Sequence, residues 1–363
     1  LFIVLMHTEP INCIDKNKSK RQNKHQIGIN REFITMNLKS LALAAAAVAI
    51  TGAAFAVPTT ASAETRLTAA SCFPVGSPPG RPFEAVVKAI NAAGKGVVNV
   101  KLIGGAPAIG SPFTLTQKLS KGAFDFVGCT EAYFGNLLPE APVFRLAEYT
   151  YAELRKNGGW DYMANLMGIK GVHMVARHHD FGPFHLWLSK KIDKPNLKGL
   201  HLRVAPVYTA FFKSLGATVQ TAALPQIYTL MENNTVQGYG WPALGWVPPW
   251  AKVTKYRVEP GFYTSTLFTM ANQKKWNSLP QDVKDVINKA AMASEAKGEP
   301  AGPEFKASLK KQHAWLEKQG VGVIEFKGAE RDFWVKSAKD AAWGEVLARS
   351  PVHGPKLMKL FTK

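Results

Sequence analysis

Cysteine is scarce in this 363-residue chain, which contains only three. So few cysteines exclude a disulfide-rich scaffold, and no Cys-x-x-Cys pair is present for zinc binding or thioredoxin-like redox chemistry. The sequence also lacks the signatures of a nucleophile elbow, a phosphate-binding loop and a zinc protease. Its one long apolar run, residues 41–57, excludes a polytopic membrane protein. What remains is close to the composition of a soluble globular protein, with 46% hydrophobic and 20% charged residues.

The N-terminal part has the pattern of an export signal. Residues 36–39 form a short basic start, residues 41–55 an Ala-rich apolar stretch, and residues 61–63 (Ala-Ser-Ala) the small residues that a signal peptidase reads. We therefore expect a signal peptide at 36–63 and a mature chain that begins near Glu64 in the periplasm. A retained transmembrane anchor is the alternative.

The segment before this signal fits no structural class. Residues 1–35 mix Lys, Asn and Gln with little periodicity. We interpret them as a mis-annotated leader, translated from a misplaced start, and take Met36 as the true start. Neither the leader nor the signal peptide is expected to belong to the fold.

The chain is strongly basic, with a formal net charge of +19. Residues 1–63 hold seven of its 45 basic and three of its 26 acidic residues, so the mature part keeps a charge of +15. Such a balance favours anionic ligands or acidic partners. Nucleic acid is not expected as a partner, because the lysines are scattered and no nucleic-acid-binding signature is present.

Strand-like and helix-like segments alternate along the mature chain, which indicates βαβ units, parallel sheets and two α/β lobes. In such sheets ligands bind beyond the carboxyl ends of the strands. Two facing edges would form a cleft, and we expect Phe73, Thr130, Arg203 and Trp241 at these ends. The expected strands are 65–71, 97–103, 124–129, 170–177, 184–189, 200–204, 217–221 and 237–242, and the expected helices include 113–120, 207–215, 225–233 and 305–318.

Two cysteines, Cys72 and Cys129, remain in the mature chain, and each follows a predicted strand of the first lobe. A secretory compartment permits a disulfide between them. Their matching positions allow the pairing, but pairing requires Cα atoms within about 7 Å, so free thiols remain the alternative.

Four stretches, in order along the chain, together carry a family resemblance. They are 117–125 (QKLSKGAFD), 196–204 (NLKGLHLRV), 224–228 (LPQIY) and 276–283 (WNSLPQDV). In this order and behind a signal peptide, they resemble the substrate-binding proteins of tripartite ATP-independent periplasmic (TRAP) transporters, the dicarboxylate-binding-protein-like family.

The resemblance implies a two-lobed periplasmic binding protein of the α/β class, a venus-flytrap fold with crossover strands and a long helix that braces both lobes. Lobe I is expected at 64–180 plus 267–306, and lobe II at 181–266 plus 307–363. The family implies a monomer without enzymatic activity, cofactor or metal. Its partners are a small organic acid and the membrane subunits of a TRAP permease.

The family motif at 196–204 ends in the arginine that holds the ligand carboxylate, so the resemblance assigns that role to Arg203. An arginine fork matches a carboxylate in two hydrogen bonds and stays charged when desolvated. This sequence departs from the family at Trp241, which replaces a polar asparagine, and at residues 180–184, where a second arginine is missing.

Both departures favour a monocarboxylate with an aromatic or branched apolar tail over a dicarboxylate, because aromatic walls suit an apolar body. The alternative for each aromatic side chain is an ordinary place in the core. The candidate ligand-binding walls are Phe73, Tyr133, Phe184, Tyr208, Trp241 and Phe262.

Two other functions remain open: a periplasmic ligand sensor that docks on a receptor, and a secreted hydrolase that works through His185 or His201. No paired nucleophile or carboxylate supports the hydrolase. His185 or His201 can also accept a second ligand charge. Metal binding by His178 and His179 is disfavoured, because neighbouring strand residues point to opposite faces; we expect a solvated turn there.

Overall fold

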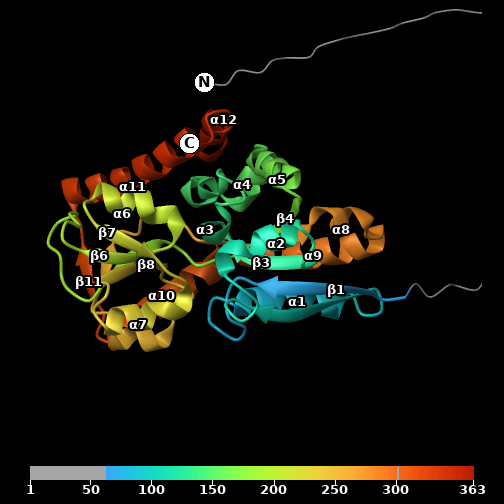
Figure 1. The fold of residues 1–363 in the computed structure, drawn as a ribbon, viewed down its shortest axis with the longest axis horizontal. Helices are drawn as coiled ribbons and strands as arrows, with labels where there is room; N and C mark the ends of the chain where they lie inside the picture. The colour runs from blue at the N-terminus through green and yellow to red at the C-terminus, as the bar shows by residue number, and fades with distance from the viewer. Residues whose placement is uncertain (1–62, 301) are drawn as a thin grey trace, which may run out of the picture. The chain divides into compact units, whose positions relative to one another are not determined.

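The computed structural model describes residues 63–300 and 302–363. The expected leader and signal peptide lie outside these residues. The first sheet has the order β2-β1-β3-β10-β4 (Figure 1). Its strands are β1 (Thr65–Ser71), β2 (Val98–Gly105), β3 (Phe126–Thr130), β4 (Val172–Asp180) and β10 (Thr266–Asn272).

Strand directions in this sheet differ from the parallel arrangement expected from the sequence. β1 pairs in parallel with β2 and β3, but β10 runs antiparallel to both β3 and β4. The expectation of a wholly parallel sheet was wrong here, because β10 returns from the second sheet and enters the first from the opposite end.

Helices cover both faces of the first sheet, and we call the sheet with its helices lobe I. Apolar residues on one face of α1 (Arg81–Ala93) and α9 (Gln281–Lys297) pack together against the sheet, among them Val86, Ile90 and Ile287. The opposite face carries α2 (Leu115–Ser120), α3 (Glu131–Phe134), α4 (Tyr151–Lys156) and α5 (Gly159–Ile169), with α8 (Gln273–Ser278) following β10.

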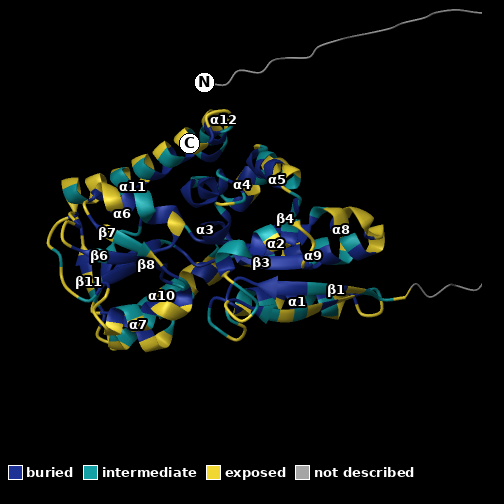
Figure 2. Ribbon diagram, in the orientation of Figure 1, coloured by how far each residue is buried: buried dark blue, intermediate teal, exposed yellow. Residues whose placement is uncertain are grey.

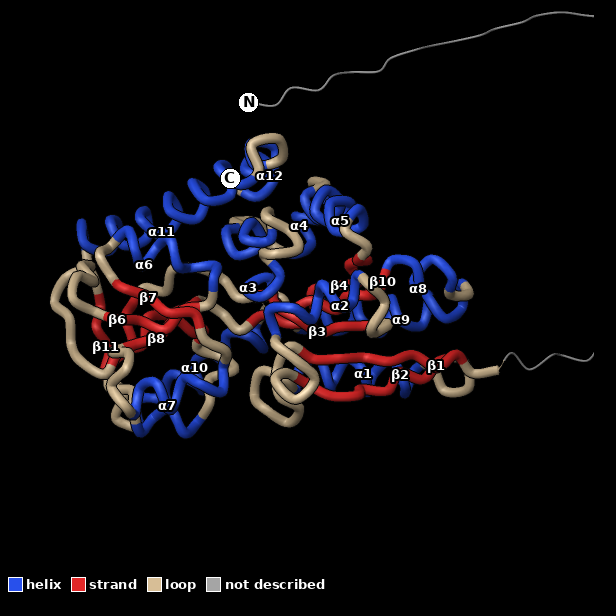
Figure 3. Tube along the Cα trace, viewed as in Figure 1, coloured by secondary structure: helices blue, strands red, loops and turns tan. Residues whose placement is uncertain are grey.

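The second sheet has the order β11-β9-β5-β8-β6-β7, and with its helices it forms lobe II (Figure 3). β6 is parallel to β7 and β8, whereas β5 is antiparallel to β8 and β9. The strands are β5 (Phe184–Leu188), β6 (His201–Val204), β7 (Thr218–Thr221), β8 (Gly238–Pro242), β9 (Tyr256–Glu259) and β11 (Gly322–Glu325).

Helices pack on both faces of the lobe II sheet. Side chains of α6 (Thr209–Ser214) and α11 (Gly328–Arg349) pack together, through Phe211 and Trp334 for example. On the other side lies α10 (Pro303–Lys318), whose Trp315 packs on Trp246. α7 (Ile227–Glu232) completes the lobe.

The longest helix, α11, connects the lobes as the bracing helix that the resemblance implies. It packs on α6 of lobe II and on the 3-10 helix η2 (Ala141–Leu146) of lobe I, and α12 (Gly354–Phe361) continues onto η2 and α5. One core cluster of buried apolar residues extends through both lobes, seen as dark blue in Figure 2. No helix among the described residues is both long and apolar enough to cross a membrane.

One local prediction needs correction. His178 and His179 belong to strand β4 and not to a solvated turn, and His178 is buried with its Nδ1 3.0 Å from the Thr269 hydroxyl. The reason is that β4 runs three residues beyond the predicted strand, because β10 pairs with it as far as Asp180.

Candidate functional site

A cavity lies where the two sheets face each other, beyond the carboxyl ends of β1, β3, β6 and β8. This is the edge at which open α/β sheets bind ligands. Lobe I and lobe II both contribute to its wall. The lining residues are Phe73, Thr130, Ala132, Tyr133, Phe181, Phe184, Ala205, Tyr208, Trp241, Pro242 and Ser265.

The cavity is apolar and narrow. The cavity volume is only about 10 Å³. That is room for about one water. A molecule larger than water can therefore enter only when the lobes or these side chains move apart.

Arg203 lies behind the wall, at the end of β6, and is fully buried. Its guanidinium donates through Nε to the Ala222 carbonyl at 2.8 Å and through Nη1 to the Tyr208 hydroxyl at 3.1 Å. No carboxylate of the described residues forms an ion pair with it, although the buried Arg177 and Arg257 each have one. A desolvated charge without a counter-ion is costly, so an anion that reached Arg203 would supply the missing counter-ion.

Aromatic side chains connect Arg203 to the cavity. The Trp241 ring centroid is 5.8 Å from the guanidinium carbon, and the Tyr208 hydroxyl, which accepts from Arg203, donates to the Gly240 carbonyl at 2.7 Å. Glycine is required at position 240, because a Cβ there would lie 2.6 Å from the Tyr208 ring. Burial raises the pKa of Tyr133 to about 12 and also raises that of Tyr208, against the influence of the Arg203 charge. Both phenols are therefore neutral hydrogen-bonding groups at neutral pH.

The structure brings five of the six candidate wall residues together. Phe73, Tyr133, Phe184, Tyr208 and Trp241 all line the cavity. Phe262 lies behind them, in contact with Phe184, Tyr208 and Trp334, and it does not line the cavity.

Neither histidine considered for the site reaches this cavity. His185 follows Phe184 on β5 and points to the opposite face of the sheet, where its Nδ1 lies 3.0 Å from the Val258 carbonyl. His201 contacts the Thr218 hydroxyl and Gln220 on the neighbouring strand β7. Neither is placed to act as a base or to hold a second ligand charge here.

Sequence reasoning missed a pair of buried charged residues next to the cavity. Glu131 and Arg145 are nearly inaccessible, and Arg145 reaches from lobe I to donate through Nη1 to the Val207 carbonyl of lobe II. Burial raises the pKa of Glu131 to about 7, although Arg145 and a hydrogen bond from Thr130 oppose the shift. No sequence motif marks these residues, because they meet only in the folded chain.

Glu131 should make the protein less stable as the pH rises from 4.5 to 7. In this range the unfolded state is ionised at Glu131 while the folded state keeps the proton, so ionisation favours unfolding. Relative to wild type, Glu131→Gln should gain up to about 3 kcal/mol in unfolding free energy across this range. Urea unfolding at several pH values measures the gain. Exposed Glu317→Gln is the control, and parallel profiles for Glu131→Gln and wild type would disprove the shift.

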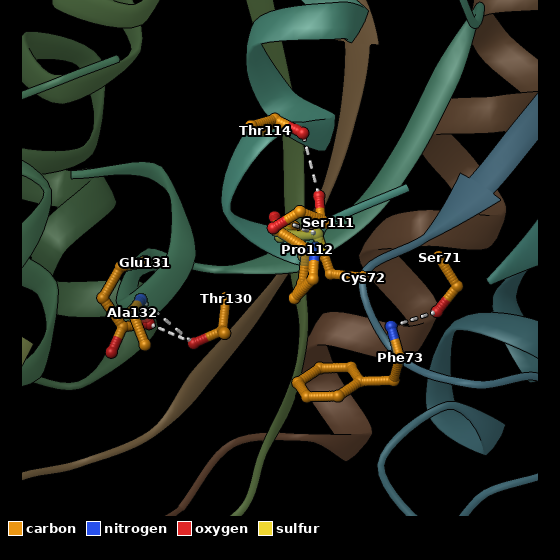
Figure 4. The surroundings of a disulfide bond; sticks show 10 residues. Ser71, Cys72, Phe73, Ser111, Pro112, Thr114, Thr130, Glu131 and Ala132 are labelled. Atoms are coloured by element: carbon orange, nitrogen blue, oxygen red, sulfur yellow. Dashed lines mark hydrogen bonds between the residues drawn. A yellow bond between two sulfur atoms is a disulfide. The ribbon is translucent and has the colours of Figure 1, made fainter. Parts of the chain in front are cut away.

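A disulfide holds two strand ends beneath the cavity. Cys72 and Cys129 are bonded, with their Cα atoms 5.0 Å apart. The bond joins the ends of β1 and β3, directly before Phe73 and Thr130 of the cavity wall (Figure 4). The backbone N–H of Phe73 also donates to the Ser71 hydroxyl at 3.1 Å, which fixes the chain at this point.

Comparison with known proteins places this geometry among transport proteins. The family model for bacterial extracellular solute-binding proteins, family 7, matches residues 70–348. A solute-binding protein of Roseobacter denitrificans is 25% identical over 169 residues, 46% of this chain. These residues are 50% of that relative, so the match spans about half of its length.

Solved structures share the fold over most of the chain. A TRAP periplasmic solute-binding protein from Desulfovibrio salexigens with bound orotic acid has a TM-score of 0.70 and 19% identity, covering 82% of this chain and 97% of its own. DctP7 of Bordetella pertussis, which binds pyroglutamic acid, has a TM-score of 0.73 and 15% identity, and the match covers 82% of this chain and 100% of DctP7. A TRAP periplasmic solute-binding protein from Roseobacter denitrificans with bound L-galactonate has a TM-score of 0.69 and 18% identity, and the match covers 83% of this chain and 99% of its own. These likenesses confirm the two-lobed α/β fold.

Proposed function

This chain belongs to the bacterial extracellular solute-binding proteins of family 7, whose members serve transporters and are not enzymes, and we propose that it captures a small organic anion for a TRAP permease. The ligand occupies the cavity between the lobes, and the loaded protein, as a monomer, delivers it to the membrane subunits. The observation that carries this proposal is Arg203, a buried guanidinium without a carboxylate partner among the described residues.

The arrangement of donors supports a carboxylate at this place. Arg203 donates through Nε and Nη2 to the Ala222 carbonyl and through Nη1 to the Tyr208 hydroxyl and the Gly240 carbonyl, and a carboxylate between the lobes can replace these weaker contacts with charge-assisted ones. Tyr133 and Tyr208 line the same space, and the Tyr208 hydroxyl can donate to a ligand there if it gives up its hydrogen bond to the Gly240 carbonyl. Arg203, Phe73, Tyr133, Phe184, Tyr208 and Trp241 form the proposed ligand site, with Phe262 supporting the wall from behind.

We propose that the ligand is a monocarboxylate with an apolar body. Among the residues that line the cavity, none is Lys, Arg or His, and its polar groups are hydroxyls. A second carboxylate would be buried without a cationic partner, which is costly. The solved relatives bind acids as different as orotic acid and L-galactonate, so the comparisons leave the ligand class open.

A thermal-shift screen of organic acids tests the proposed function. A ligand present at 100 times its dissociation constant should add about 2.7 kcal/mol to the stability. We expect a raised melting temperature with at least one small carboxylate. An absence of any shift across aromatic, branched, sugar-derived and C4 acids would contradict the proposal.

The ligand class is tested by competition between two kinds of acid. An aromatic or branched-chain keto acid should displace succinate or malate, because only one carboxylate can reach Arg203 and the apolar body fits the wall. Trp241→Asn should narrow this preference, since it replaces part of the apolar wall with an amide. Tighter binding of the dicarboxylate to wild type would overturn the monocarboxylate proposal but not the transport role.

The family is periplasmic, and we propose that residues 36–63 direct the export and are removed. N-terminal sequencing of the exported protein should find a start near Glu64. Retention of residues 36–63 would contradict this.

We also propose the lobe boundaries 64–180 plus 267–306 for lobe I and 181–266 plus 307–363 for lobe II. Each set of residues contains the strands of one sheet, except that Thr266, the first residue of β10, falls in the range of lobe II.

A further inference from the structure

Two histidines and a glutamate come together on the second sheet, on the face opposite to the Phe184 side chain. His185 lies on β5, Glu259 ends the neighbouring strand β9, and His313 lies on α10, which covers this face. One possible metal-binding atom from each lies within 4.8 Å of the other two. The three residues come from distant parts of the sequence, which is why spacing alone predicted no metal site.

The two imidazoles have unused nitrogens at this place. His185 is fully buried, and neither its Nε2 nor that of His313 has a hydrogen-bond partner among the described residues. The His185 Nδ1 lies 3.0 Å from the Val258 carbonyl, so it donates there and leaves Nε2 as a free lone pair. Buried polar atoms are rarely left unpartnered without a reason. A backbone carbonyl that accepts from the other ring nitrogen, and so fixes the tautomer, is typical of metal-binding histidines.

The glutamate has one oxygen available for the same space. Glu259 Oε1 is 2.9 Å from Arg257 Nε in an ion pair, whereas Oε2 is 3.6 Å from His185 Nδ1. Arg257 thus holds one carboxylate oxygen, and Oε2, which lies beside the His185 ring, stays available to a metal ion.

We propose that His185, Glu259 and His313 bind a divalent transition-metal ion, with Zn²⁺ as the best chemical match. Two imidazole nitrogens and one carboxylate oxygen are a common set of zinc ligands, and water can take the fourth position. Burial lowers the pKa of His185 to about 3 and that of His313 to about 4. Both rings are thus neutral at pH 7, the form that binds metal.

The geometry requires a small adjustment on binding. Two ligands that each lie about 2.1 Å from zinc are at most about 4 Å apart, so a separation of 4.8 Å must shorten. Glu259 and His313 are only partly buried and can move, whereas His185 is held in the sheet. The bound ion would connect α10 to the strands β5 and β9, and none of its three ligands lines the cavity.

Zinc binding to the tag-free full chain tests the proposal, with a chromogenic zinc chelator as competitor. We expect one ion per chain in this site. Loss of a hydrogen bond that orients a metal ligand already weakens metal binding about 10- to 100-fold. Because His313→Gln and Glu259→Gln each remove a ligand itself, each should weaken zinc binding at least about 10-fold. His201→Gln, on the edge strand side of lobe II, is the matched control and should leave the affinity unchanged.

Cobalt gives an independent readout of the same site. Co²⁺ should show the strong visible absorption of four-coordinate cobalt in wild type, and zinc should abolish it by displacement. His313→Gln should lose the absorption while keeping the wild-type circular dichroism, since His313 is only partly buried. An absence of zinc binding by wild type, or wild-type affinity in both His313→Gln and Glu259→Gln, would overturn the proposal, whatever organic acid the cavity binds.

Discussion

Arg203→Ala is expected to weaken binding of the organic acid at least thirtyfold. The guanidinium is buried behind the cavity and has no carboxylate partner among the described residues, so a bound carboxylate would be its counter-ion. Removing one member of a desolvated charge pair typically costs 2–5 kcal/mol. Calorimetry with the best acid from the thermal-shift screen measures the loss.

Two variants distinguish loss of the charged contact with the ligand from loss of the folded structure. Arg203→Lys keeps the charge but not the fork, so it should bind more tightly than Arg203→Ala and more weakly than wild type. Arg331→Ala removes an exposed arginine on α11 and should bind as wild type does. Wild-type affinity in a folded Arg203→Ala protein would show that this residue does not anchor the ligand.

Loss of the disulfide is expected to lower the unfolding free energy by about 4 kcal/mol. Cys72 and Cys129 are 57 residues apart in sequence, and closing a loop of this length removes much of the entropy of the unfolded chain. The double variant Cys72→Ala/Cys129→Ala should therefore unfold at a much lower urea concentration. Because Phe73 and Thr130 follow the cysteines directly, the variant should also bind the organic acid more weakly.

Reduction supplies the matched control for this variant. Dithiothreitol should destabilise wild type to nearly the level of the double variant and should leave the double variant unchanged. The exported chain that starts near Glu64 should contain no free thiol when it is denatured without reductant. Two free thiols, or an equal effect of dithiothreitol on both proteins, would contradict the pairing.

Local sequence patterns predicted the strands β1 to β8 but not β9, β10, β11 or the long helix α11. Alternation of apolar residues and the positions of glycine and proline gave β2, β5 and α10 to within three residues at each end. They could not predict that β10 and β5 run antiparallel to their neighbours. Strand direction is decided by contacts between residues far apart in sequence, such as Phe268 with Cys129.

The same limit applies to the site. Arg203 could be selected because the family resemblance assigns the carboxylate-binding role to the arginine of its motif. Phe184 and Phe262 look alike in sequence, and only packing puts one at the cavity and the other behind it. Strand alternation could have separated Phe184 from His185, since neighbours point to opposite faces. The contact of Arg145 with the Val207 carbonyl had no local signal.

If Arg203 binds the ligand carboxylate as proposed, its charge makes closure of the lobes depend on a bound ligand. An empty closed protein keeps this guanidinium away from water and from any counter-ion, which raises its free energy relative to an open, hydrated form. A bound carboxylate removes that penalty only in the closed form, and a ligand shifts a conformational equilibrium by its differential affinity for the two states. Most closed molecules would then carry a ligand, so a membrane partner that recognises the closed surface would rarely bind a ligand-free protein.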